Sequence, residues 1–183
     1  YTSTMGSGDI DEAFRRADRI VKQRLIHQRL TPMPIEARAV VALHHAGEGT
    51  LTIWTSTQVP HLLRTLLPAM IGVAENKLRV VAPEVGGGFG AKLRLCVEAY
   101  PTLLALHTGK PVKLIATREE TFTLSGFRLP TIIYMKTGVR HDGTIVAREA
   151  ISIFDMGAHL GAGVQAGVSH TLGPYNIPNY RMR

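Results

Sequence analysis

The chain has 183 residues, 45% of them hydrophobic, which is enough to bury the core of one globular domain or of two small ones. Its net charge is +7, but Lys and Arg are spread along the sequence without a run of three and only 6% of residues are aromatic, so the composition argues against nucleic-acid binding. The single cysteine excludes an internal disulfide and any cysteine-based zinc or iron–sulfur site, and no apolar run approaches the roughly 20 residues of a membrane helix.

The first 30 residues begin with an acidic group of side chains and continue as an amphipathic stretch. Asp9 is a candidate N-cap, and Phe14, Ile20 and Val21 supply the apolar positions of a helical or extended segment. We expect roughly the first 25 residues to be a segment that connects this domain to a preceding one. The chain does not begin with Met, so we expect it to be a piece of a longer protein.

Two strands and a helix are predicted next. Apolar and β-branched residues indicate strands over residues 37–45 and 50–56, separated by a glycine-containing hairpin loop. Apolar residues then recur at helical spacing over residues 60–73, where Pro60 suits the first turn. Pro68 lies inside this helix and predicts a kink.

The following elements complete the expected sheet. A strand over residues 78–82 leads into a glycine-rich loop, and residues 93–108 predict a second helix that Pro101 interrupts and Gly109 ends. Three more strands are expected, at residues 112–116, 131–137 and 145–154, with a turn at residues 141–143 between the last two. Strands in runs with two helices predict an α+β fold, a two-layer domain with a mixed sheet and two main helices.

The glycine-rich loop reads GGGFGAK over residues 86–92. Four glycines in five positions indicate a tight turn or a cradle for oxyanions, because glycine lets backbone amides approach a ligand closely and accepts positive φ. A Walker A loop is excluded, since Leu93 follows where Ser or Thr is required. Gly86, Gly88 and Ala91 satisfy G-x-G-x-x-A, so a Rossmann-type nicotinamide-binding domain remains an alternative.

Other polar residues have structural interpretations. Residues 118–120 end a predicted strand and are expected to make surface or packing contacts. Cys96 lies within the second predicted helix and is expected to be a small buried hydrophobic residue. Asp155 is expected at a structural turn before residues 157–173, a glycine- and alanine-rich stretch predicted to be irregular. The eight histidines show no metal-ligand spacing.

Five segments together resemble one enzyme family. They read HQRLTPMPIEAR at residues 27–38, WTSTQVPH at 54–61, GGGFGAK at 86–92, TREE at 117–120 and GPYNIP at 173–178. In order and spacing they are similar to the molybdenum-binding large subunit of the xanthine dehydrogenase, aldehyde oxidase and aerobic carbon monoxide dehydrogenase family. The resemblance covers nearly the whole chain. It implies that residues 1–183 are the first molybdopterin cofactor-binding domain of a larger multidomain subunit whose C-terminal half is absent from this chain.

The resemblance implies a molybdenum-dependent oxidoreductase as the activity of the complete subunit. Molybdopterin cytosine dinucleotide with molybdenum would oxidise an aldehyde, an N-heterocycle or carbon monoxide with oxygen from water, and electrons would pass to [2Fe–2S] clusters and FAD on partner subunits or segments. The implied partners are an iron–sulfur small subunit and an FAD medium subunit, in a cytoplasmic dimer of heterotrimers without a membrane span. Leu93 stands where purine-oxidising relatives carry Glu, which argues against xanthine as the substrate.

The same resemblance implies which residues bind the cofactor: Gln58, Gly87, Gly88, Phe89 and Gly90. The Gln58 amide would hydrogen-bond an oxo ligand, the loop amides would hold the cofactor, and Phe89 would form an apolar wall. Without the resemblance, Gln58 would be a cap of the helix that begins near Pro60, and Phe89 a core residue. No catalytic residue and no direct metal ligand is expected in this chain, because the family's general-base glutamate lies further along the subunit. The second alternative is a non-catalytic truncated remnant.

Overall fold

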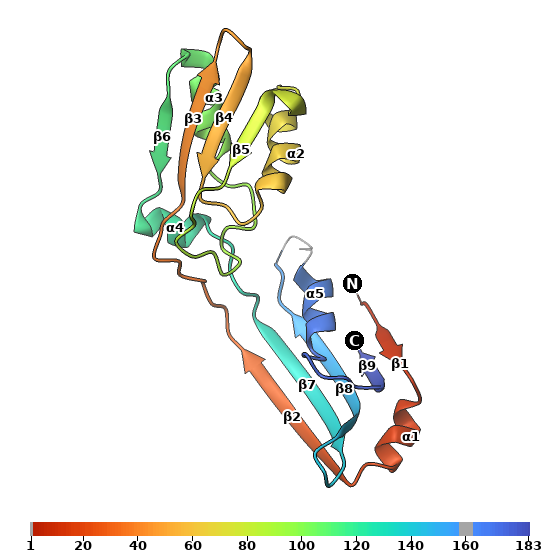
Figure 1. Ribbon diagram of the computed structural model, residues 1–183. Helices are drawn as coiled ribbons and strands as arrows, with labels where there is room; N and C mark the ends of the chain where they lie inside the picture. Colours follow the sequence, from red (N-terminus) through yellow and green to blue (C-terminus); the bar gives the residue numbers. More distant parts are fainter. Residues whose placement is uncertain (1, 158–162) are drawn as a thin grey trace. The chain divides into compact units, whose positions relative to one another are not determined.

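The computed structural model describes residues 2–157 and 163–183, which belong to two compact units (Figure 1). The first unit contains residues 1–30 and 129–183, and the second contains residues 31–128. Each unit has its own mixed β-sheet and its own helices, so the predicted α+β class is confirmed. The sequence pattern predicts a single sheet, whereas the strands form two, one in each unit.

The sheet of the second unit has four strands in the order β5-β4-β3-β6. β3 (Ala39–His45) and β4 (Thr50–Thr55) form the predicted antiparallel hairpin. β6 (Val112–Ile115) pairs antiparallel with β3, and β5 (Leu78–Val81) pairs parallel with β4. A short 3₁₀ helix, Glu75–Lys77, leads into β5. The predicted strands of this region are therefore confirmed, within one or two residues at their ends.

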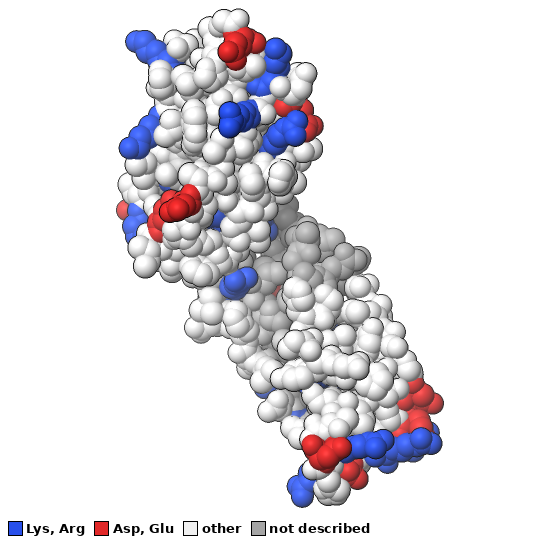
Figure 2. Space-filling view, viewed as in Figure 1, with Lys and Arg blue, Asp and Glu red and all other residues white. Residues whose placement is uncertain are grey.

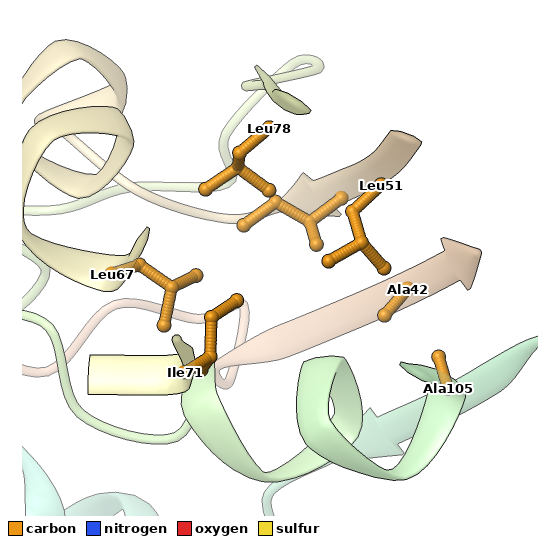
Figure 3. Packing of buried hydrophobic residues seen from close by; sticks show 7 residues of the cluster. Ala42, Leu51, Leu67, Ile71, Leu78 and Ala105 are labelled. Carbon is orange, nitrogen blue, oxygen red and sulfur yellow. The ribbon is translucent and has the colours of Figure 1, made fainter. Parts of the chain in front are cut away.

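Two helices cover one face of this sheet, α2 (Pro60–Ile71) and α3 (Ala99–Thr108). Their apolar side chains point toward those of the strands and form one buried cluster (Figure 3): Ala42, Leu51, Ile53, Leu67, Ile71, Leu78 and Ala105. Each helix ends at a glycine with a left-handed backbone, Gly72 after α2 and Gly109 after α3, as is typical of helix C-termini. The second unit is thus a layer of two helices on a mixed sheet.

The two helices differ from their predictions in detail. α3 begins at Ala99 rather than at residue 93, and residues 93–98 are not helical. Pro101 lies in the first turn of α3, where the missing N–H would have no intrahelical partner, so it does not interrupt the helix as expected. α2 continues through Pro68 to Ile71.

A short helix, α4 (Arg118–Leu124), replaces the strand end expected at residues 118–120. The Thr117 hydroxyl oxygen accepts the Glu120 N–H at 3.1 Å, and the Glu120 carboxylate accepts the Thr117 N–H at 2.7 Å. These two bonds form a capping box, which is the local reason for a helix here. The Arg118 guanidinium donates to the carbonyl oxygens of Pro34 and Ile35, so the start of α4 holds the chain just before Glu36.

Replacing Thr117 with alanine is expected to lower the free energy of unfolding by about 1 kcal/mol, because the Glu120 N–H loses its cap. Denaturant titration of the polypeptide that contains this chain measures the loss. Thr123→Ala is the matched control, since the Thr123 hydroxyl donates only to carbonyl oxygens of its own helix, at Glu119 and Glu120. Equal losses in the two variants would contradict a capping role for Thr117.

The sheet of the first unit has five strands, in the order β1-β9-β8-β7-β2. Their bounds are Met5–Ser7 (β1), Asn179–Met182 (β9), Ile145–Phe154 (β8), Thr131–Val139 (β7) and Arg19–His27 (β2). β8 and β9 pair parallel and the other neighbours antiparallel. The N-terminal residues, expected to be a connecting segment, supply two of these strands.

Two helices lie on opposite faces of this sheet. α1 (Ile10–Arg15) packs through Ile10, Ala13 and Phe14 on Ala147, and α5 (Gly163–His170) packs through Val168 on Ala150 and Met182. Ala147 and Ala150 are three residues apart on β8, so their side chains point to opposite faces.

The two helices of the first unit test two predictions, one on the N-cap of α1 and one on the stretch that contains α5. The Asp9 side chain accepts the Glu12 N–H at 3.0 Å, which confirms Asp9 as the N-cap of α1. α5 falls within residues 157–173, which were expected to be irregular, so that prediction is wrong for the helix. Residues 158–162 of the same stretch lie outside the described part of the chain.

The charged surface agrees with the composition. On the face that Figure 2 shows, Lys and Arg are interspersed with Asp and Glu and do not gather into a single basic patch. Within the part of the chain that the structure describes, no helix combines the length and the apolar character needed to cross a membrane.

Candidate functional site

The glycine loop, residues 86–92, has an unusual backbone. Gly87, Phe89 and Gly90 have φ values of 96°, 50° and 85°, and Phe89 is the one described residue other than glycine with a positive φ. Two short turn bonds fold the loop, from the Gly87 N–H to the Val85 oxygen and from the Ala91 N–H to the Gly88 oxygen, both at 2.8 Å. The glycines are required here because a side chain disfavours this left-handed geometry.

Gln58 is hydrogen-bonded to this loop. Its side-chain oxygen Oε1 accepts the N–H groups of Gly90 at 3.0 Å and of Lys92 at 3.2 Å. Gln58 also donates its backbone N–H to the Lys92 carbonyl oxygen. It does not cap α2, whose N-cap is Val59 without a side-chain hydrogen bond, so the capping interpretation is wrong. The structure thus brings Gln58 together with the predicted loop residues.

The hydrogen bonds of Gln58 also fix the direction of its amide. Because Oε1 faces two backbone donors, the other end of the amide, Nε2, is the outward donor. Among the described residues Nε2 has no hydrogen-bond acceptor, and the side chain is exposed. Gln58 therefore offers an N–H donor beside the loop.

Two loop amides are also available as donors. The N–H groups of Gly88 and Phe89 make no hydrogen bond to any residue in the described ranges. Successive free amides in a loop with left-handed residues form a concave donor site suited to phosphate or oxo oxygens. Together with Gln58 Nε2, they give three N–H donors without adding a charge.

The close packing around the loop leaves no room for side chains. A Cβ atom on Gly88 would lie 2.5 to 2.6 Å from atoms of the Gln58 side chain, and one on Gly86 would lie 2.6 Å from the Glu36 Cβ. A Cβ on Gly87 would lie 2.9 Å from the Phe89 ring. At each of the three glycines, a different neighbouring residue therefore leaves no space for a Cβ atom.

Phe89 is exposed and is not a core residue, so that interpretation is wrong. Its side chain is 63% accessible, and its carbonyl oxygen accepts a hydrogen bond from Arg128 Nη2 at 2.7 Å. The Arg128 guanidinium also lies near Gly90, where a Cβ would meet Nη1 at 3.3 Å. Arg128 thus helps to hold the strained Phe89 peptide in place.

A buried ion pair lies next to the loop. Arg38 Nη1 is 3.1 Å from Glu98 Oε1, and the two side chains are only 2% and 1% exposed. Arg38 Nη2 also donates to the carbonyl oxygens of Ala91 at 2.7 Å and Arg94 at 3.1 Å. Glu98 Oε2 accepts the Cys96 N–H at 2.7 Å. These bonds satisfy backbone groups of residues 91–96 without a helix, which explains why α3 starts later than predicted.

A second ion pair joins the two ends of the loop. Lys92 Nζ is 2.6 Å from Glu36 Oε2, and the same oxygen accepts the Gly86 N–H at 2.8 Å. Glu36, Lys92 and Arg128 are site residues that the sequence pattern does not predict. Glu36 and Lys92 lie in two of the quoted motifs, but nothing in the sequence pairs residues so far apart, and no sequence signal marks Arg128.

The remaining candidates have structural roles. Asp155 Oδ1 accepts the Gly157 N–H at 3.3 Å, as a structural turn requires. Cys96 precedes α3 and is partly buried; burial raises the pKa of its thiol, whose sulfur donates to the Leu124 oxygen. In the described ranges, no three His, Cys, Asp or Glu side chains come together as a metal site.

The glycine loop does not belong to a dinucleotide-binding unit. In such a unit the glycines connect a strand directly to a helix, whose N-terminus binds the pyrophosphate. Here β5 ends at Val81, and the next helix, α3, begins only at Ala99. The nicotinamide-binding interpretation of the loop is therefore wrong.

Comparison with known proteins gives consistent matches over the full length of the chain. Residues 1–183 match the family model described as a molybdopterin cofactor-binding domain. The chain is 39% identical over 178 residues to the nicotinate dehydrogenase large molybdopterin subunit of Eubacterium barkeri, covering 96% of the chain and 42% of that protein. It is 30% identical over 184 residues to the carbon monoxide dehydrogenase large chain of Hydrogenophaga pseudoflava, covering 96% of this chain and 23% of that protein. The chain thus spans less than half the length of these curated relatives.

Solved structures show the same fold. The aldehyde oxidoreductase of Desulfovibrio gigas matches with a TM-score of 0.80 and 28% identity, over 97% of this chain and 20% of that one. The carbon monoxide dehydrogenase of Oligotropha carboxidovorans matches with a TM-score of 0.71 and 27% identity, over 97% of this chain and 23% of that one.

Proposed function

Because this chain belongs to the molybdopterin cofactor-binding domain family, we propose that its glycine loop and Gln58 hold one side of a molybdenum–pterin cofactor. The observation that carries the proposal is a set of three donors with no hydrogen-bond partner among the described residues: the N–H groups of Gly88 and Phe89 and Nε2 of Gln58. Neutral donors suit the oxygen-rich groups of such a cofactor, since they bind acceptor oxygens without adding charge.

Each residue of the site has a defined part in the proposed binding. Gln58 donates its amide N–H to an acceptor of the cofactor while its Oε1 holds Gly90 and Lys92. The amides of Gly88 and Phe89 donate beside it. The exposed Phe89 ring forms an apolar wall that excludes water and strengthens these hydrogen bonds. When bound, the cofactor supplies oxidation of the substrate with oxygen from water.

We assign no catalytic base and no direct metal ligand to this chain. The proposed activity is that of the complete subunit: oxidation of a small molecule, with cytosine dinucleotide as the cofactor form and electrons passing to [2Fe–2S] clusters and FAD. Partner iron–sulfur and FAD subunits in a cytoplasmic dimer of heterotrimers complete the proposal. Among aldehydes, N-heterocycles and carbon monoxide, the 39% identity to a nicotinate dehydrogenase subunit favours an N-heterocycle.

The test is the molybdenum and releasable CMP content of the native protein that contains this chain, purified from its source. Elemental mass spectrometry measures molybdenum per polypeptide, and nucleotide chromatography measures CMP. Near-stoichiometric values of both are expected. Molybdenum without CMP would support the pterin site but not the cytosine dinucleotide, and absence of both would leave a non-catalytic remnant as the better description.

A further inference from the structure

The two ends of the glycine loop meet on one carboxylate oxygen. Glu36 Oε2 accepts the Gly86 N–H at 2.8 Å, where the loop begins, and the Lys92 ammonium at 2.6 Å, where it ends. The Glu36 N–H also donates to the Gly86 carbonyl oxygen at 3.2 Å. A residue 50 positions before the loop therefore closes it through both backbone and side chain.

The buried Lys92 side chain is paired through this contact. The Lys92 side chain is 1% exposed, whereas that of Glu36 is 32% exposed. In the described part of the chain, Glu36 is the one hydrogen-bond and ion-pair partner of Lys92 Nζ, so no second acidic group shares the buried cation. A buried ammonium without a partner is strongly unfavourable, so Glu36 is needed to hold the Lys92 side chain in place.

Closure of the loop matters because ordering the residues between its two ends costs conformational entropy. Gly87, Phe89 and Gly90 all have positive φ, and glycines lose much conformational freedom when they are ordered. Gln58 holds the second half of the loop, through Gly90 and Lys92. Gly86, at the start of the loop, has its N–H and its carbonyl oxygen bonded to Glu36. Without Glu36, the first half of the loop would be held mainly by turn bonds.

We propose that Glu36 is a positioning residue for the cofactor, acting through Gly86 and Lys92. It closes the glycine loop and neutralises the buried Lys92 cation, and so keeps the Gly88 and Phe89 amides arranged as donors before the cofactor binds. This inference rests on the proposed function of the loop. A preorganised site binds more tightly because less ordering is needed on binding.

The test compares the wild-type holoenzyme that contains this chain with Glu36→Gln. Glutamine has the same shape and its amide oxygen still accepts the Gly86 N–H, but the Lys92 cation is left uncompensated. We expect the variant to release its pterin about ten-fold faster, because the free energy lost with one charge-assisted hydrogen bond corresponds to about a ten-fold change in a binding constant. Pterin fluorescence after gel filtration measures the release. In the molecules that retain molybdenum, its electron paramagnetic resonance spectrum is expected to change.

Two further variants make the result specific. Glu75→Gln is the matched control, since Glu75 pairs with Arg64 at 3.9 Å with both side chains half-exposed. Glu36→Gln combined with Lys92→Met removes both charges, and its pterin release rate and spectrum are expected to return most of the way to the wild-type values, because removing both charges costs far less than leaving the buried Lys92 cation unpaired.

The outcomes separate this inference from the proposed function. A wild-type enzyme without molybdenum and pterin would overturn the proposed function itself. A wild-type enzyme that holds both, together with a Glu36→Gln variant that releases pterin at the rate of the Glu75→Gln control and has an unchanged spectrum, would overturn only the role of Glu36. A Glu36→Gln variant that unfolds more easily but keeps the wild-type release rate and spectrum would likewise show that Glu36 only stabilises the fold.

Discussion

Replacing Glu98 with glutamine is expected to lower the free energy of unfolding by about 3 to 5 kcal/mol, the range found when one partner of a buried ion pair is removed. Arg38 would keep its charge with a neutral partner at 2% exposure. The new amide also lacks acceptors: Glu98 Oε2 takes the Cys96 N–H and Oε1 takes Arg38 and Thr55, so a glutamine NH₂ would face a donor at either end.

Denaturant titration of the polypeptide that contains this chain measures this loss, and hydrogen exchange reports where it acts. Exchange is expected to rise at the Cys96 amide. The control is again Glu75→Gln, which breaks an exposed pair and is expected to change the free energy by no more than about 0.5 kcal/mol. A loss below about 1 kcal/mol for Glu98→Gln would mean that water or Arg38 rearrangement compensates for the missing charge.

Replacing Gly88 with alanine is expected to weaken cofactor binding by at least about ten-fold. The added Cβ would lie 2.5 to 2.6 Å from Gln58 Cδ, Cγ and Oε1, so the side chain must move. Movement would break the hydrogen bonds from Gly90 and Lys92 to Oε1 and turn the Nε2 donor away from the loop. One methyl group thus disturbs both the Nε2 donor of Gln58 and the two hydrogen bonds by which Gln58 holds the loop.

The measurement for Gly88→Ala is the molybdenum and pterin content of the purified enzyme, with thermal unfolding as a check on the fold. Gly47→Ala is the matched control, because a Cβ there meets nothing within 4 Å. Full cofactor content in Gly88→Ala would show that the Gln58 side chain can move without loss of cofactor binding, and the proposed role of its amide would then be wrong.

Local patterns were enough to predict much of the second unit and one turn of the first. The hairpin of β3 and β4 follows from two apolar runs around a glycine-containing loop, and α2 follows from leucines at helical spacing after Pro60. The turn at residues 141–143 is confirmed between β7 and β8, where the Gly143 N–H donates to the Arg140 oxygen. In these places neighbouring residues decide the structure, so sequence spacing is informative.

Long-range contacts explain what the sequence did not predict. β2 carries adjacent apolar pairs, Ile20–Val21 and Leu25–Ile26, which fit neither a strand nor a helix period, and it is ordered by pairing with β7. Residues 93–98 have a helical pattern, but Arg38 and Glu98 take their backbone hydrogen bonds. Glu36 and Arg128 reach the glycine loop from 50 and 39 positions away, a proximity that only the fold creates.

Gly86 and Gly88 differ in how they can change during evolution. At Gly86 the obstacle is the Glu36 Cβ, an atom that every residue except glycine possesses, so substitution at position 36 by any amino acid other than glycine leaves the obstacle in place. At Gly88 the obstacle is the outer part of the Gln58 side chain, which a shorter residue would not have. Positions 58 and 88 are therefore able to covary among descendants of this protein, whereas position 86 stays glycine as long as its partner at position 36 has a Cβ atom.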